Sequence, residues 1–384
     1  MTAADQAAAR RDALVRRTLY IHIGNHRTGT TSIQRFLYGN AGKLLENGYL
    51  YPLGVRRHDK LVRGLFSKRT RVGEVIAHGH KIKGISSELN AEADEAGHRI
   101  SSIVLSDEDI CMSKDFRLLR QFREHFDVRI VFSLRRQDTW LESWYLQNIK
   151  WQWNADLSHC TFDDFLARVE DFHWLHYDTF VADLQEQFGA ENVLINVFEK
   201  DQMPDGPVVD FCRLIGLNDL TGFSKPPHVN HSMSAEMTEF TRHLPLELLS
   251  NAEKYFLVDT LKRVDLKVLG NTGKQSERLM APELRQRIIE KYSDGNRALA
   301  RRYFERDALF PEPLPDQNTP LADLRIPEGS AEIIERIVSP LVLELSRRAK
   351  ARTSQAQADD RGRQRLFSGR RAGNLVKSLK QRLF

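Results

Sequence analysis

The chain has 384 residues, 41% of them apolar, which is enough for one large, well-buried domain with smaller additions. Its formal charge is +5, but residues 346–384 hold twelve Lys or Arg against two Asp, so the rest sums to −5, which argues against a nucleic-acid binder. Three scattered cysteines without a CxxC pair argue against a disulfide framework or structural zinc, and no apolar run reaches the roughly 20 residues that span a bilayer.

Short apolar runs alternate with helical patterns over the first two thirds of the chain. The runs predict strands at 18–24, 48–52, 100–106, 127–134 and 191–198. Helical spacing is found at 30–47, 115–125, 138–150, 174–188 and 207–216, and 55–99 is expected to be helical in pieces. This order predicts an α/β fold of three layers, α/β/α, with a central parallel sheet of about five strands. Ligands of such sheets bind beyond the carboxyl ends of the strands.

The remainder of the chain predicts a helical C-terminal portion. Helices are expected at 234–250, 251–264, 282–304 and 331–349, with a Pro-rich connector at 310–320. The expected organisation is a polar leader 1–17, a main domain 18–310 that is mainly helical from about 232, a linker and helix 311–345, and a basic tail 346–384. The leader lacks the apolar centre of a signal peptide, which together with the unpaired cysteines indicates a cytoplasmic protein.

The first strand runs into the loop G-N-H-R-T-G-T-T-S, residues 24–32. In a turn between a strand and a helix, backbone N–H groups converge on an anion, which makes this a P-loop-like site. Gly24 and Gly29 have the spacing of a nucleotide triphosphatase loop, but Thr30 stands where those enzymes have lysine. The only cation inside the loop is Arg27. Three hydroxyl side chains open the following helix: Thr30, Thr31 and Ser32.

The run Arg27-Thr28-Gly29-Thr30-Thr31-Ser32 resembles the 5′-phosphosulfate loop of the sulfotransferase family, commonly K-[ST]-G-[TS]-[TS], with arginine in place of the usual lysine. The donor of that family is 3′-phosphoadenosine 5′-phosphosulfate. Its 3′-phosphate is held by an Arg at a strand end and a Ser eight residues later, and Arg135 and Ser143 match these positions. Arg136 is the alternative register for the arginine.

The resemblance covers about residues 18–310, with weaker similarity to bacterial, glycan-directed members at 177–201, 207–217, 226–234 and 295–304. It implies transfer of a sulfuryl group from this donor to a hydroxyl or amine of a cell-envelope glycan or lipid-linked saccharide. No metal is expected, because the transferred group carries less charge than a phosphoryl group. Two alternatives stay open: a P-loop nucleotide-dependent kinase, and a non-catalytic nucleotide-binding relative.

The acceptor needs a general base near the loop. His58 follows the second predicted strand and Glu108 follows the third, and the resemblance allows either residue type. His26, inside the loop, is a third candidate. Arg27 is expected to act electrostatically, because a guanidinium does not readily give up its proton.

Two further features bear on the acceptor and on location. Aromatic residues that follow the donor arginine could stack on sugars, although helical spacing, as in Trp140 and Trp144, is more typical of a core. In the tail, Leu375, Leu379 and Leu383 form one stripe of a basic amphipathic helix. Such a helix predicts peripheral contact with an anionic membrane, and a solvated, disordered tail is the alternative.

Overall fold

The computed structural model describes residues 16–59, 82–225, 233–270, 278–322, 324, 326 and 329–349, with the backbone of 66–68 and 75–77. The predicted membrane-binding stripe of the tail and nearly all of the predicted leader lie outside these residues. Contacts divide the chain into two compact units, one of 1–149, 153–232 and 273–322, the other of 150–152, 233–272 and 323–384. Each of these units is assembled from separate segments of the chain. The contiguous division expected from the sequence stays a prediction.

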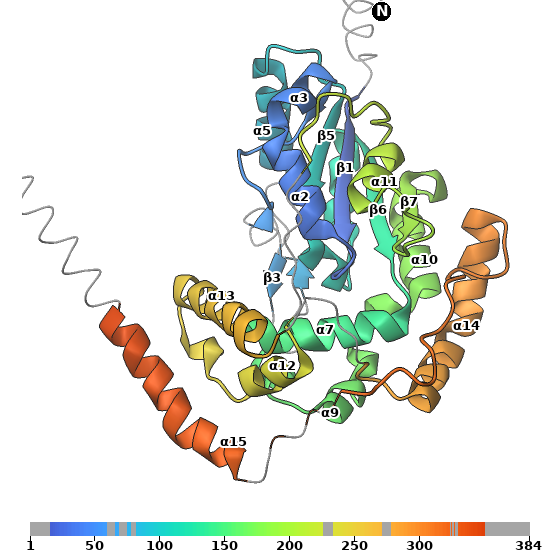
Figure 1. Ribbon diagram of the computed structural model, residues 1–384. Coiled ribbons are helices and arrows are strands. Elements are labelled where there is room, and N and C mark those ends of the chain that lie inside the picture. Colours follow the sequence, from blue (N-terminus) through green and yellow to red (C-terminus); the bar gives the residue numbers. More distant parts are fainter. Residues whose placement is uncertain are drawn as a thin grey trace, which may run out of the picture. The chain divides into compact units, whose positions relative to one another are not determined.

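The first unit is built on one parallel sheet of five strands in the order β2-β5-β1-β6-β7 (Figure 1). The strands are β1 (Thr18–Gly24), β2 (Tyr49–Leu50), β5 (Ser102–Ser106), β6 (Asp127–Leu134) and β7 (Val193–Val197). In the central register, Tyr20 of β1 lies opposite Val104 of β5 and Arg129 of β6. All five predicted strands are therefore confirmed.

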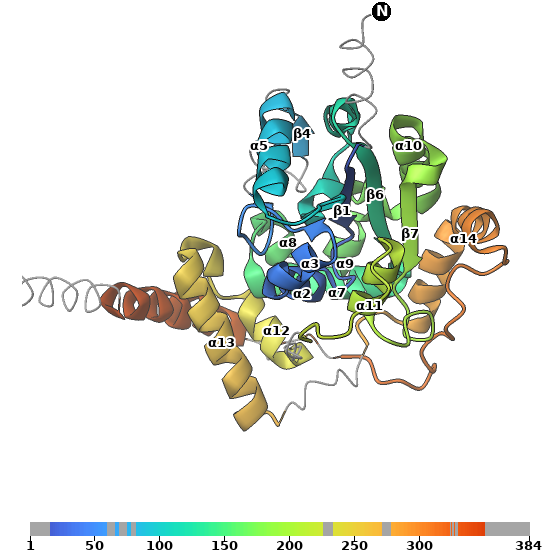
Figure 2. The same ribbon diagram turned by 90° about the horizontal axis from the view of Figure 1, so that it is seen from above.

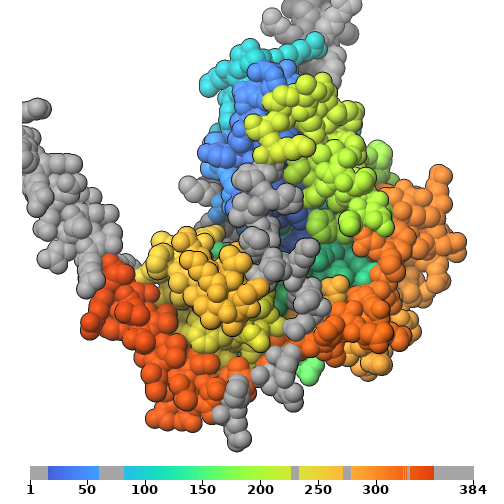
Figure 3. Space-filling view, in the orientation of Figure 1, coloured from blue at the N-terminus to red at the C-terminus, as the bar shows by residue number. Residues whose placement is uncertain are grey.

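Helices cover both faces of this sheet, which confirms the three-layer α/β/α prediction. On one face, α2 (Thr30–Gly39), α3 (Ala41–Glu46) and α11 (Pro207–Leu214) share a buried cluster with Tyr20, Val104 and Val131 of the strands. Figure 2 shows α2 and α11 on one side of the strands and α10 (Tyr177–Phe188) on the other. On that second face, Phe180 of α10 packs against Phe132 with ring centroids 4.8 Å apart. At the surface, residues around α11 lie beside the blue N-terminal helices (Figure 3).

Helix α7 (Gln137–Trp151) follows β6 and lies across the carboxyl ends of the strands (Figure 1). Two of its carboxylates are buried against Arg285 of α14 (Pro282–Phe304), which donates to Asp138 and, at 2.7 Å, to Glu142. Asp138 also accepts from Arg136, and Glu142 from the backbone N–H groups of Leu279 and Met280. This buried ion cluster fixes α7 relative to α14.

We expect Arg285→Ala to lower the free energy of unfolding by about 3 kcal/mol, because it leaves buried carboxylates without their cation. Urea denaturation measures this loss. Arg117→Ala is the matched control, since the Arg117–Asp115 pair is largely exposed and its loss should leave the free energy of unfolding nearly unchanged. Equal effects of the two substitutions would contradict the structural role of Arg285.

Two predictions for the first unit need correction. The helix expected at 30–47 is broken at Asn40, whose side chain donates to Phe36 O and exchanges hydrogen bonds with the backbone of Ser224. The segment 55–99, expected to be helical, also contains strands β3 (Phe66–Lys68) and β4 (Val75–Ala77), which pair antiparallel before α5 (Ile82–Glu95). The sequence pattern in this segment was too weak to separate a short strand from a short helix.

The predicted helical C-terminal portion is confirmed. Helix α14 has the expected bounds, and the second unit contains α12 (Ala235–Arg242), α13 (Asn251–Val268) and α15 (Ser330–Ile333). A π turn at Ile334–Val338 follows α15 just before Pro340, whose missing N–H cannot continue an ordinary α-helical ladder. Among the described residues, no helix is both long and apolar enough to cross a membrane.

Candidate functional site

The loop after β1 is packed so closely that side chains larger than glycine do not fit at two of its positions. Gly24 has φ 74° and Gly29 has φ 83°, a region that favours glycine. A Cβ on Gly24 would lie 2.8 Å from Glu108 Cβ, and one on Gly29 would lie 2.8 Å from Pro207. Helix α2 starts here without a side-chain cap and without an acid in its first turn. Its N-terminus is therefore suited to an anion.

Arg27 points from the loop to α7. It has φ 67°, an uncommon value for a residue with a side chain. Its Nε donates to Ser143 Oγ at 2.6 Å and its guanidinium also donates to Gln147 Oε1 at 3.1 Å. Burial lowers the pKa of Arg27. The sequence-predicted residues Arg27 and Ser143 are thus brought into direct contact.

Arg135, at the end of β6, reaches the same loop. Its guanidinium donates to the carbonyl oxygen of Arg27 at 2.6 Å and to Thr139 Oγ1 at 3.3 Å. Its backbone is held by Tyr177, whose hydroxyl donates to Arg135 O and accepts from Arg135 N. The end of β6 and the loop after β1 therefore form one cationic centre.

No carboxylate among the residues that the structure describes is in direct contact with this centre, although Asp138 and Glu142 act on Arg135 from a greater distance. There, neither Arg27 nor Arg135 has a carboxylate oxygen within 4.0 Å. Burial and the neighbouring Arg27 lower the pKa of Arg135 to about 10, so Arg135 is still charged at neutral pH. Both arginines are half-buried, and a charge that is partly withdrawn from water is costly unless paired, so a bound anion would stabilise them.

The alternative register, Arg136, is already occupied. It donates to both carboxylate oxygens of Asp138 and to the carbonyl oxygen of Glu312 at 2.8 Å. This pairing favours Arg135 as the ligand-binding arginine. The joint role of Arg135 and Ser143 at a 3′-phosphate stays a prediction, since Ser143 here accepts from Arg27.

A cavity of about 380 Å³ begins at this cationic centre. Its lining includes Arg135 and Thr139 together with Phe198 and Pro207. Phe198 and Pro207 also pack against Gly29, so the cavity adjoins the loop. Its volume falls in the range of small-molecule sites.

His58 is held by backbone groups. Its Nδ1 accepts from Ser106 N at 3.0 Å, and its Nε2 lies 3.1 Å from Pro52 O, to which the Nε2–H tautomer would donate. Burial lowers the pKa of His58, which keeps the ring neutral. With both ring nitrogens engaged, His58 has a positioning role, and a role as base stays an untested prediction.

Glu108 lies beside the loop, since its Cβ and Thr30 Cγ2 are the nearest atoms to a Cβ built on Gly24. Its Oε2 accepts from Gln34 Nε2 at 2.6 Å, and its Oε1 is 3.3 Å from a guanidinium nitrogen of Arg57. Of the two main base candidates, Glu108 is therefore the one in contact with the loop.

The sequence prediction missed Arg57, which neutralises a compact acidic group. It lies 2.7 Å from Asp107 Oδ1 and 2.9 Å from Asp109 Oδ1, in addition to Glu108. Burial raises the pKa of Asp107 to about 6 against the lowering effect of Arg57. Asp109 also lies 3.5 Å from His26 Nε2, which ties the third base candidate to the same cluster. No group of three His, Cys, Asp or Glu among the described residues could hold a metal ion.

The aromatic residues that follow Arg135 are mostly core. Trp140 stacks on Trp144 at 5.5 Å and contacts Phe172 and Trp174, and all four are buried. The indole nitrogen of Trp140 donates to His26 O at 2.7 Å and so fixes the loop backbone against α7. Burial of these rings confirms the core interpretation and removes them from sugar stacking.

The 295–304 segment also proves to be packing. A Cβ on Gly295 would lie 2.7 Å from the carboxyl group of Asp178, so α14 approaches α10 closely there. Asn296 and Gln137 exchange amide hydrogen bonds at 3.0 Å.

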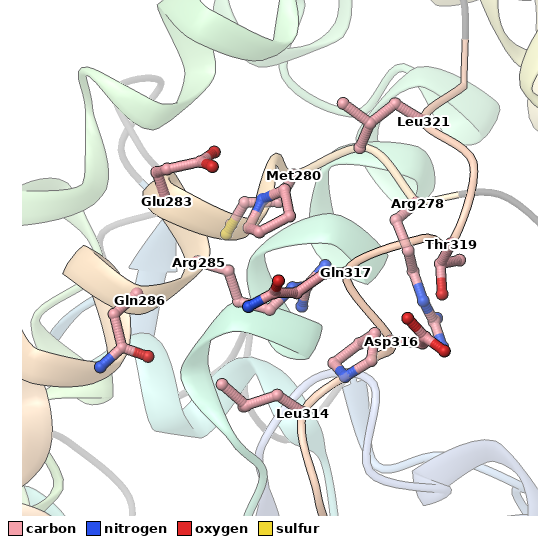
Figure 4. A pocket seen from close by; sticks show the side chains of 12 residues that line it. Arg278, Met280, Glu283, Arg285, Gln286, Leu314, Asp316, Gln317, Thr319 and Leu321 are labelled. Carbon is pink, nitrogen blue, oxygen red and sulfur yellow. The ribbon is translucent and has the colours of Figure 1, made fainter.

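A second cavity, of about 400 Å³, lies between the start of α14 and the connector (Figure 4). Arg278 and Asp316 line it on one side and Glu283 and Gln286 on the other. It contains none of the residues that the sequence predicts for the site. Arg285, which also borders it, is committed to the α7 carboxylates.

Comparison with known proteins gives distant similarities. No protein-family model matches the chain. An uncharacterized protein from Archaeoglobus fulgidus is 26% identical over 191 residues, which is 48% of this chain and 49% of the relative, so the match spans about half of that protein's length. A solved structure of a sulfotransferase from Alicyclobacillus acidocaldarius aligns with a TM-score of 0.42 and 14% identity, covering 77% of this chain and 98% of that one. Neither similarity is close enough to assign a function.

Proposed function

We propose that the protein is a sulfotransferase that moves a sulfuryl group from 3′-phosphoadenosine 5′-phosphosulfate to an acceptor hydroxyl or amine. One observation carries this proposal: Arg27 and Arg135, whose half-buried guanidinium groups have no carboxylate partner within 4.0 Å among the described residues, come together at the loop that leads into α2. Two fixed cations match a donor with two separate anionic groups. The cavity beside Arg135 offers room for its nucleoside.

In this proposal each residue has a defined task. The N–H groups of Thr30 and Thr31 and the hydroxyls of Thr30, Thr31 and Ser32 bind the 5′-phosphosulfate, whereas the Ser32 N–H already donates to Gly29 O. Arg27 stabilises the charge that develops as the sulfuryl group leaves. Its bonds to Ser143 and Gln147 hold the guanidinium in place beforehand. Glu108 receives the acceptor proton, because its side chain begins directly against the loop at Gly24.

Calorimetric titration tests the donor assignment. Adenosine 3′,5′-bisphosphate should bind about ten- to a hundredfold more tightly than adenosine 5′-monophosphate, because its 3′-phosphate gains a charge-assisted hydrogen bond. ATP with magnesium should bind more weakly than the bisphosphate. A preference for magnesium ATP would instead support the P-loop kinase.

The acceptor is proposed to be a glycan or a lipid-linked saccharide. This part rests on the weaker resemblance of later segments, 226–234 and 295–304, to bacterial, glycan-directed sulfotransferases. Transfer of radiolabelled sulfate to a panel of saccharides tests it. Tight bisphosphate binding without transfer to any acceptor would favour the non-catalytic relative.

A further inference from the structure

A buried carboxylate with one unused oxygen lines the cavity next to Arg135. Glu199 follows β7 by two residues and is only 7% exposed. Its Oε2 accepts from Gln202 Nε2 at 2.6 Å. Its Oε1 is buried and has no hydrogen-bond partner among the described residues. Most buried carboxylate oxygens are paired, so this atom needs explaining.

The surroundings of Glu199 destabilise its charged form as long as Oε1 lacks a hydrogen-bond donor. Burial raises the pKa of Glu199, and the negative charge of Glu312 raises it further. Gln202, the Glu312 backbone and the more distant Arg136 lower this pKa but do not cancel the effect of burial. A hydrogen-bond donor supplied by a ligand would stabilise the carboxylate.

The cavity also connects Glu199 to the loop. The walls of the cavity are apolar at Phe198, Met203 and Pro207. Arg135 lines the end of the cavity that adjoins the loop. The Arg135 guanidinium lies 5.5 Å from the centroid of the Phe198 ring. A ligand with a phosphate at Arg135 and a flat apolar group between these walls would present its edge to Glu199.

We infer that Glu199 Oε1 accepts a hydrogen bond from the exocyclic amino group of adenine and so selects adenine over purines with a 6-oxo group. This inference rests on the proposed function, which supplies an adenosine bisphosphate as ligand. An amino group donates to the free oxygen, whereas a 6-oxo group is an acceptor and would face the carboxylate with like partial charge. Unpaired buried acceptors of this kind are the basis of strong discrimination.

Titration with a matched pair of ligands tests this inference. Wild-type protein should bind adenosine 3′,5′-bisphosphate about tenfold or more tightly than inosine 3′,5′-bisphosphate. Glu199→Gln should reduce this preference to about onefold or reverse it, because a carboxamide can donate to the 6-oxo group. Glu312 lines the same cavity, and Glu312→Gln is the control. This variant should keep the wild-type preference for adenine, because Glu312 Oε1 already accepts a hydrogen bond from Asp201 N.

The outcomes separate this inference from the proposed function. If wild-type protein binds neither bisphosphate, both fail. If it binds both ligands tightly and equally, only the role of Glu199 is overturned. A third ligand, 2′-deoxyadenosine 3′,5′-bisphosphate, should bind as well as the ribose form. Loss of binding with this ligand, together with no adenine preference, would show that Glu199 pairs with the ribose instead.

Discussion

Arg27→Ala is expected to lower kcat/KM for sulfuryl transfer by about 10³-fold or more, the range of a charge-stabilising arginine in the related phosphoryl transfer. The guanidinium is half-buried, has no carboxylate partner in the described part of the chain, and is held by Ser143 and Gln147. Its removal takes away the only cation of the loop. A steady-state assay with radiolabelled donor measures the loss.

Arg27→Lys is the matched control for this prediction. Lysine is the usual residue of the sulfotransferase loop and keeps the charge, but it lacks the planar fork that reaches both α7 side chains. We expect it to retain most of the activity that alanine loses. Normal turnover by Arg27→Ala would remove the residue from the chemistry and with it the main support for the proposed function.

The parts of the fold that the sequence predicts are those dictated by local patterns. Buried parallel strands appear as continuous apolar runs, as in β1, where six of seven residues are buried. Helix α14 begins at Pro282, a residue favoured at the first helical position, so its start has a local signal. Its end has none, because Glu305, with φ 51°, stands where glycine is the favoured residue. Where the pattern was weak, between 55 and 99, the two short strands were missed.

The site is only partly predictable, because its contacts join distant segments. Arg27 and Ser143 are 116 residues apart. The sequence could bring them together only because Arg27 follows the first predicted strand and Ser143 lies on the helix after the fourth, and the carboxyl ends of parallel strands share one sheet edge. Nothing local announces that Arg57 neutralises Asp107 and its neighbours, or that both His58 nitrogens are engaged by the backbone. The pairing of Arg136 with Asp138 two residues later was visible as a charge pair, and it separates the two arginine registers.

Glu108→Gln is expected to lower kcat by about 10²–10⁴-fold while leaving the Kd for adenosine 3′,5′-bisphosphate nearly unchanged. The substitution removes the proton acceptor but keeps an oxygen for the hydrogen bond from Gln34, and Arg57 keeps Asp107 and Asp109. Transfer rates at saturating donor, with calorimetry on the same samples, separate chemistry from binding.

His58→Gln supplies the contrast. If His58 only positions the strand ends, its substitution should lower the free energy of unfolding, because the backbone of Ser106 and Pro52 loses its partners, and turnover of the folded fraction should persist. Loss of turnover in His58→Gln with normal stability, and not in Glu108→Gln, would assign the base to the histidine. If neither variant loses turnover, the base is a different group, and His26, 3.5 Å from Asp109, is the next residue to replace.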